Sequence, residues 1–178
     1  MATTTIPFDA GQLLIGGRWQ AAANGATLAL ENPSDGSALA PIARGAAADV
    51  DAAVGAAQAA LDGEWGRLTA AERGRLLAAI GRKVLEQADE LARLEALDVG
   101  KPLKQGRADA VALARYLEFY GGAADKVHGQ TLPFNNGYTA LTIREPHGVT
   151  GHIVPWNYPM QIVGRLSLIH ISEPTRPY

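Results

Sequence analysis

The chain has 178 residues, which suffices for one domain with its own core or for the front part of a larger protein. Its 16 basic and 18 acidic residues are interspersed, so neither a nucleic-acid footprint nor a polybasic membrane patch is visible. Without a long apolar run or a secretory signal pattern, we expect a cytoplasmic protein with no membrane or nucleic-acid partner. Cysteine is absent, which removes any thiol nucleophile from this chain.

Short strands open the predicted fold. Residues 13–19 have the pattern of a strand closed by a glycine turn, and residues 27–31 alternate like a second strand. The sequence Asn-Pro-Ser-Asp-Gly at residues 32–36 is typical of a turn, and residues 39–43 follow as a third short strand. We predict a small N-terminal sheet that carries no catalytic residue.

Helical patterns begin at Ala47. A stripe of apolar residues indicates an amphipathic helix that ends at Gly63: Val50, Val54, Ala57 and Leu61. Thr69 and Glu72 have the spacing of a capping box at the start of a second helix. A third helix carries apolar residues at positions 91, 94 and 97, and we expect it to end where Gly100 suits a left-handed C-cap and Pro102 blocks continuation.

Residues 104–124 predict a fourth helix, and residues 138–145 alternate like an exposed strand. Asp98 and Lys101, at the end of the third helix, could form an acid–base pair. The simpler interpretation of these two residues is a helix terminator whose charges are solvated. We therefore assign them no catalytic role.

The most informative stretch is residues 148–160, Gly-Val-Thr-Gly-His-Ile-Val-Pro-Trp-Asn-Tyr-Pro-Met. Its β-branched residues predict a short buried strand over 149–154, and Pro155 and Pro159 should prevent both a longer strand and a normal helix start. A strand that ends in a kinked loop is a common place for chemistry in α/β proteins. Asn157 is the candidate there, because a neutral amide can donate to an oxyanion; a helix-capping asparagine is the alternative.

Three motifs, in this order and spacing, resemble the N-terminal part of the aldehyde dehydrogenase superfamily. They are Leu-Asp-Val-Gly-Lys-Pro-Leu at 97–103, Arg-Glu-Pro-His-Gly-Val at 144–149 and Ile-Val-Pro-Trp-Asn-Tyr-Pro at 153–159. The resemblance covers about residues 13–165, roughly the first third of such an enzyme. It implies a truncated α/β fold, in which residues 1–165 supply N-terminal strands and helices plus the first strand of a Rossmann-like NAD-binding sheet.

The resemblance also implies roles for individual residues. Asn157 falls on the family's oxyanion-hole asparagine, a donor whose contribution is on the order of 3 to 4 kcal/mol. Four residues would line the ribose and nicotinamide of NAD or NADP: Ile153, Val154, Pro155 and Trp156. Residues 138–146 resemble part of the oligomerisation arm, which implies a homo-oligomer. The histidines at 128, 147, 152 and 170 have no metal-ligand spacing, so we expect no metal site.

Departures from the family limit this chain. The nucleophilic cysteine, the glutamate base, the lysine for the adenosine ribose and the glycine-rich turn lie downstream in the family. Residues 166–178 match nothing in it and resemble a translated sequencing-adaptor read, so we expect a non-family tail. The intact enzyme would oxidise an aldehyde to a carboxylate through a cysteine thiohemiacetal and a thioester, and the chain alone would be inactive. The alternative is a non-catalytic piece that pairs with a full-length subunit.

Overall fold

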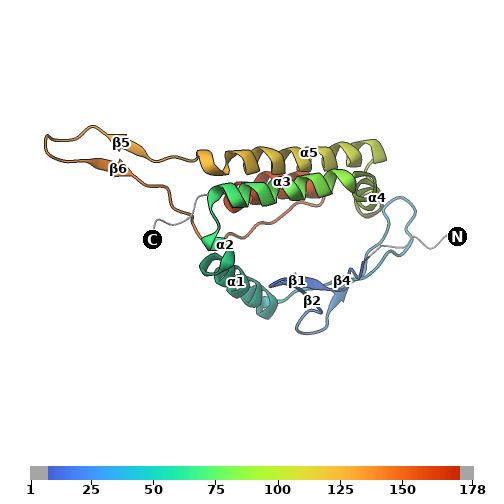
Figure 1. Cartoon of the computed structure of the whole chain (residues 1–178). Helices are drawn as coiled ribbons and strands as arrows, with labels where there is room; N and C mark the ends of the chain where they lie inside the picture. Colours follow the sequence, from blue (N-terminus) through green and yellow to red (C-terminus); the bar gives the residue numbers. More distant parts are fainter. Residues whose placement is uncertain (1–7, 173–178) are drawn as a thin grey trace.

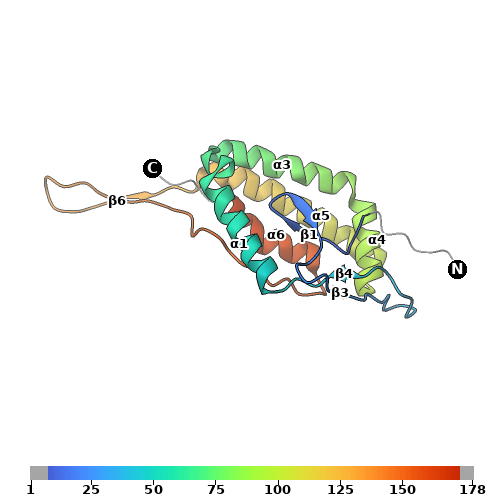
Figure 2. The ribbon, with the colours of Figure 1, turned by 90° about the horizontal axis from the view of Figure 1, so that it is seen from below.

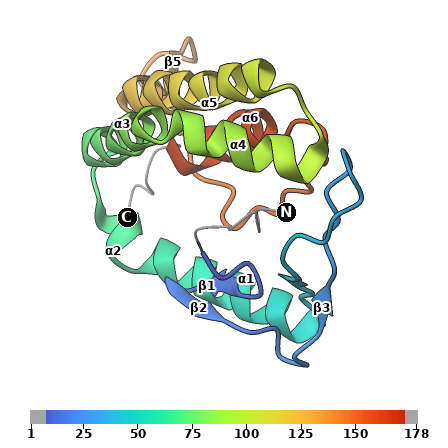
Figure 3. The same ribbon diagram turned by 90° about the vertical axis from the view of Figure 1, so that its right-hand side faces the viewer.

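The computed structural model describes residues 8–172 and has two layers. Figure 3 shows a layer of helices on one side and, opposite it, helix α1 with the N-terminal strands. In chain order the elements are β1 (Leu13–Ile15), β2 (Arg18–Gln20), β3 (Thr27–Leu28), β4 (Ile42–Ala43), α1 (Ala47–Asp62), α2 (Glu64–Arg67), α3 (Ala70–Glu86), α4 (Ala88–Val99), α5 (Leu103–Ala123), the 3-10 helix η1 (Ala124–Lys126), β5 (Gln130–Leu132), β6 (Ala140–Thr142) and α6 (Pro159–Ser172).

The described strands form three separate antiparallel pairs. β1 pairs with β2 across a turn of two glycines with positive φ, and β3 pairs with β4. We predicted one small N-terminal sheet, whereas the structure has two pairs there. The predicted turn at residues 32–36 forms, with the Asn32 side chain accepting a hydrogen bond from the Ser34 backbone at 2.9 Å.

The core lies where α3, α5 and α6 pack together, as Figure 1 shows. Its buried centre consists of one leucine from each helix: Leu77, Leu117 and Leu168. Partly buried residues surround it, among them Tyr116 and Tyr120 of α5. The apolar faces of these three helices thus pack against one another. Such packing is the usual source of helix stability in proteins.

The predicted helix ends are confirmed where capping chemistry marks them. The Thr69 side chain accepts from the Glu72 backbone, and the Glu72 side chain accepts from the Thr69 backbone at 2.8 Å, which completes the capping box of α3. Gly100 adopts the left-handed conformation with φ of 70° after α4, and Pro102 precedes α5. Local hydrogen bonding and backbone sterics decide these boundaries.

Most of the apolar stripe of α1 is exposed, although an amphipathic helix normally turns such a stripe toward a core. The helix itself spans the predicted residues and ends before Gly63, but Val50 is 59% exposed and Val54 is 48% exposed. The buried residue of α1 is Asp49, whose carboxylate accepts from the Ala23 and Ala46 backbone amides at 2.9 Å each. Within residues 8–172, no layer covers the outer face of this helix.

The strand expected over residues 138–145 is part of a hairpin. Its paired part is β6, which pairs with β5 in the register Gln130 to Thr142. Figures 1 and 2 show this hairpin extending away from the helices, with one segment of the chain leading out to it and another leading back. We call this hairpin, residues 130–142, the arm.

The buried strand predicted over residues 149–154 does not form. These residues have no regular secondary structure, and Ile153 is 95% exposed. A strand needs a neighbouring strand to satisfy its backbone groups, and residues 8–172 supply none here. The expectation that Pro159 prevents a helix start was also wrong: α6 begins at this proline, because the first helical position needs no backbone N–H.

Helix α6 continues past the boundary that we predicted at residue 165. It runs to Ser172, and Leu168 on it belongs to the buried core. Gly164 is also buried, against the side chains of Leu113 and Tyr116 of α5. The first part of the expected tail is therefore packed into the fold, whereas residues 173–178 lie outside the described residues.

Candidate functional site

The loop before α6 carries the candidate catalytic residue. Asn157 lies in a turn and is exposed, and its side chain makes no hydrogen bond among the described residues. The capping alternative for Asn157 is therefore not supported, because a capping asparagine accepts from a backbone N–H of the helix that it precedes. Its amide can donate to an external oxygen.

The four residues before Asn157 form an open surface. Ile153 and Pro155 are exposed, Trp156 is 76% exposed and Val154 is half-buried. Successive side chains of an extended segment point to alternating sides, so the four do not converge on one enclosed pocket. Their proposed contact with a dinucleotide therefore stays a prediction.

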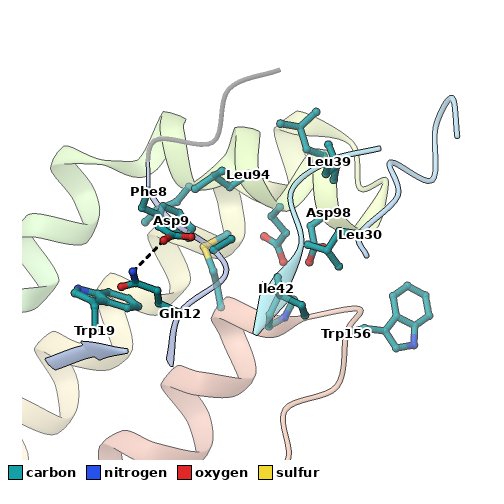
Figure 4. Close-up of a pocket in the computed structure, with 16 residues that line it drawn as sticks. Phe8, Asp9, Gln12, Trp19, Leu30, Leu39, Ile42, Leu94, Asp98 and Trp156 are labelled. Atoms are coloured by element: carbon teal, nitrogen blue, oxygen red, sulfur yellow. Dashed lines mark hydrogen bonds between the residues drawn. The ribbon is translucent and has the colours of Figure 1, made fainter. Parts of the chain in front are cut away.

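A cavity of about 560 Å³ lies beside this loop, and Figure 4 shows the residues that line it. Helix α4 supplies Leu91, Leu94 and Leu97 to its wall, and the N-terminal segment supplies Leu30 and Ile42 among others. Trp156 of the loop and Pro159 and Met160 at the start of α6 complete the lining. Of the predicted site residues, only Trp156 lines it. The wall is mostly apolar, which suits packing or an apolar ligand rather than catalysis.

A cluster of buried charged residues lies behind the loop. Lys101 Nζ is 2.7 Å from Glu95 Oε1 and 2.5 Å from Asp109 Oδ2, and the three side chains are at most 8% exposed. The other Asp109 oxygen accepts from Gln161 at 2.6 Å and from Gln105 at 2.9 Å. This cluster connects α4, α5 and the first turn of α6.

The two carboxylates of the cluster titrate differently. Burial acts to raise the pKa of Asp109, but hydrogen bonds from Lys101, Gln161 and Gln105 outweigh it and hold that pKa below its ordinary value. Burial raises the pKa of Glu95, and its bond to Lys101 does not compensate. For Lys101, burial acts to lower the pKa, but the bonds to both carboxylates raise it overall. The Lys101–Asp109 pair is thus the stable ion pair of the cluster.

The interpretation of Lys101 as a solvated charge was wrong. Its side chain is buried, and it pairs with Glu95 and Asp109 rather than with the exposed Asp98. Sequence reasoning missed Asp109, Gln161 and Glu95 altogether. One feature of the sequence could have indicated this cluster: Asp109 lies between two alanines on a helix face that is otherwise apolar. A charge on such a face requires a buried partner.

Residues 8–172 contain neither a metal-binding cluster nor a helix that could span a membrane. No group of three or more histidine, aspartate and glutamate side chains there is arranged to hold a metal ion. None of the described helices combines the length and apolar character needed to cross a membrane.

Comparison with known proteins decides the family. Residues 19–171, most of the chain, match the model of the aldehyde dehydrogenase family. The chain belongs to this family. The match ends six residues beyond our predicted boundary at 165, in agreement with the packing of α6.

Individual aldehyde dehydrogenases cover nearly all of the chain. Hydroxyisobutyraldehyde dehydrogenase of Mycolicibacterium austroafricanum is 43% identical over 86% of this chain and 30% of its own length. A crystal structure assigned as an aldehyde dehydrogenase from Burkholderia cenocepacia has 57% identity and a TM-score of 0.89, over 91% of this chain and 34% of that one. A structure of PnpE in complex with nicotinamide adenine dinucleotide has 38% identity and a TM-score of 0.89, over 93% and 34%.

These matches confirm the predicted family and the truncated α/β fold. The chain spans about a third of the length of the relatives that it matches. The strand pairs are isolated and segment 149–154 is exposed because only the N-terminal part of an aldehyde dehydrogenase fold is present here.

The residues of the loop fit one side of a nicotinamide cofactor. Ile153 and Trp156 are both exposed, so each can offer apolar surface to a ring or a ribose. The described residues contain no Gly-x-Gly-x-x-Gly sequence and no P-loop sequence for the phosphates.

Proposed function

We propose that the whole protein oxidises an aldehyde to a carboxylate with NAD+ or NADP+, and that this chain supplies the oxyanion donor. The observation that supports the proposal is the exposed, unbonded amide of Asn157 in the Pro-Trp-Asn loop of an aldehyde dehydrogenase. A neutral amide keeps its donor at every pH at which enzymes work, so it can stabilise negative charge that develops on an aldehyde oxygen.

The neighbouring residues have separate tasks. The nicotinamide and ribose would lie against apolar side chains of this loop, which are those of Ile153, Val154, Pro155 and Trp156. NAD(P)+, when bound, accepts the hydride of the aldehyde. The nucleophile and the general base come from outside residues 1–178, because the family uses a cysteine and this chain has none.

The chain by itself should therefore be inactive. Purified chain mixed with short aliphatic or aromatic aldehydes and NAD+ or NADP+ should produce no NADH or NADPH above background at 340 nm. The control is the B. cenocepacia protein under the same conditions. Turnover by this chain at ordinary enzyme rates, with host enzymes removed, would show that aldehyde oxidation by this chain does not need a cysteine.

A chimera tests the role of Asn157. Residues 19–171 of this chain replace the matching third of the B. cenocepacia protein, which is 57% identical. We expect aldehyde-dependent reduction of NAD(P)+ by the chimera, and a loss of about 10²- to 10³-fold in kcat for Asn157→Ala. Asn136→Ala, which changes another exposed asparagine, is the matched control and should retain activity. An active chimera with an unaffected Asn157→Ala variant would refute the proposed role.

A second candidate function is assembly through the arm. Its support is the extended hairpin, whose large apolar side chains are exposed: Leu132 at 45%, Phe134 at 67%, Tyr138 at 72% and Leu141 at 59%. An exposed apolar edge strand can add to the sheet of another subunit. We therefore propose that the arm pairs with another subunit of the same family.

Size-exclusion chromatography with the B. cenocepacia protein tests the arm. Co-elution of this chain with it is expected, and Leu141→Glu should abolish co-elution by placing a charge on the paired edge. Asn136→Glu adds the same charge in the connecting loop and should not. Elution of the unmodified chain as a separate monomer would reject the second candidate function.

A further inference from the structure

Lys101 is buried at the junction of three helices behind the Asn157 loop. It follows Gly100, the left-handed C-cap of α4, and its side chain is 8% exposed. Its ammonium donates to Glu95 on α4 and to Asp109 on α5. Removing such a cation from water is unfavourable, so its position in the fold needs compensating contacts on several sides.

Asp109 extends this connection to α6. It is fully buried on α5, and its second oxygen accepts from the Gln161 side chain at 2.6 Å. Gln161 is the third residue of α6 and lies 52 positions further along the chain. Hydrogen bonds to an ionised acceptor are stronger than neutral ones, so the Lys101–Asp109 pair holds the first turn of α6 firmly against α5.

Lys101 also contacts the residue next to Asn157. Its Nζ lies 4.1 Å from the centroid of the Tyr158 ring, within the range of a cation–π interaction. The Tyr158 carbonyl in turn accepts from the Ile162 backbone at 2.9 Å, at the start of α6. Lys101 thus contacts Tyr158 directly and is linked to Gln161 through Asp109. These two residues follow Asn157 by one and four positions.

We propose that Lys101 is a positioning residue for the Asn157 amide. It acts through Tyr158, and through Asp109 and Gln161, on the backbone turn that carries the amide, and it touches no reacting atom. The inference rests on the proposed function, since the position of the amide matters for catalysis only if it donates to an oxyanion. A displacement of about 1 Å can reduce a catalytic rate on the order of 10²-fold, so loosening the turn should be measurable.

The structural part of the proposal is testable in this chain without catalysis. Hydrogen exchange by NMR reports the opening of the Ile162 backbone amide, with amides of α3 as the internal reference. Lys101→Met and Tyr158→Leu should speed exchange at Ile162 about tenfold or more relative to α3. Tyr158→Phe keeps the ring and should not. Unchanged relative exchange in Lys101→Met would overturn the proposal.

The catalytic part is testable by a double-mutant cycle in the chimera. Lys101→Met should lower kcat on the order of 10²-fold, with little change in KM for the aldehyde, when Asn157 is present. In the Asn157→Ala background, Lys101→Met should have little further effect, because its action passes through the missing amide. Equal losses in both backgrounds would overturn the proposal, since a merely structural role predicts them.

The two proposals fail in distinguishable ways. An active chimera that is insensitive to Asn157→Ala rejects the oxyanion role, whereas the exchange experiment still reports whether Lys101 holds the turn. A sensitive Asn157→Ala variant combined with an insensitive Lys101→Met variant rejects only the positioning role.

Discussion

Asp109 and Glu95 share one cation, Lys101, but the structure satisfies the two carboxylates unequally. Asp109 accepts hydrogen bonds from three side chains. Glu95 accepts one from Lys101, and its Oε2 is buried with no hydrogen-bond partner among the described residues. Burying an ionised group with an unsatisfied oxygen is costly. Glu95 is therefore the member of the cluster whose charge should oppose folding.

The pH dependence of stability should reveal this opposition. Burial raises the folded-state pKa of Glu95 above its unfolded value. The contribution of Glu95 to the free energy of unfolding is therefore fully present below the ordinary glutamate pKa. It declines as the pH rises through the raised pKa. Glu95→Gln should remove that decline. The measurement is urea unfolding of both proteins at a series of pH values from about 4 upwards, starting near the ordinary pKa. Identical pH profiles would contradict the assignment.

Glu90 provides a control of opposite sign. The hydrogen bond from Arg93 holds the pKa of Glu90 below its ordinary value. Its stabilising effect is present above the ordinary pKa and is lost as pH falls through the lowered one. Glu90→Gln should therefore reduce stability at neutral pH relative to acid, whereas Glu95→Gln should do the reverse.

Helices α3 and α5 approach closely because each has a glycine at their contact. A Cβ on Gly74 would lie 2.2 Å from the Gly121 carbonyl oxygen, and a Cβ on Gly121 would lie 2.7 Å from the Gly74 carbonyl oxygen. Backbone oxygens cannot move aside as a flexible side chain can. The spacing of the two helices, and with it the position of Asp109 on α5, depends on these glycines.

Gly121→Ala should therefore destabilise the chain by about 1–3 kcal/mol, the usual cost of overpacking a core. The neighbouring Gly122 has open space around its Cβ position and is exposed on the same helix. Gly122→Ala should be neutral or stabilise the helix by up to about 1 kcal/mol. Urea unfolding of the two variants compares them, and equal effects would mean that the helix contact does not set the cost.

At the scale of the whole molecule, much apolar surface has no partner. Ile153 is 95% exposed, and the outward residues of α1 and the arm are exposed as well. The relatives are about three times as long, which explains why a third of the fold leaves such surface uncovered. Exposed apolar segments without neighbouring strands favour association, so we expect poor solubility.

Ile153→Lys should separate solubility from stability. Because the side chain is exposed, the substitution should change unfolding free energy by no more than about 0.5 kcal/mol while it reduces concentration-dependent light scattering. Leu168→Ala, in the buried core of α6, is the contrasting variant and should cost about 2–5 kcal/mol. A large stability loss for Ile153→Lys would show that residues 149–154 pack against the chain after all.

The sequence by itself determined the local features and the family. The capping residues Thr69 and Glu72, and Gly100 with Pro102, mark helix ends because hydrogen bonding and backbone sterics act within a few residues. The three motifs indicated an aldehyde dehydrogenase, which the family match confirms. The role of Asn157 remains a prediction from that resemblance.

Only the tertiary structure decided which surfaces and charges are buried. The stripe of α1 and the segment 149–154 have the apolar patterns of buried elements, yet burial requires a neighbour that residues 8–172 do not contain. Conversely, the side chain of Lys101 is buried because α5 brings Asp109 to it, and Gln161 of α6, 52 positions after Asp109, hydrogen-bonds the other oxygen of that carboxylate. Long-range packing sets the local dielectric and supplies the partner groups, and a single sequence does not specify either directly.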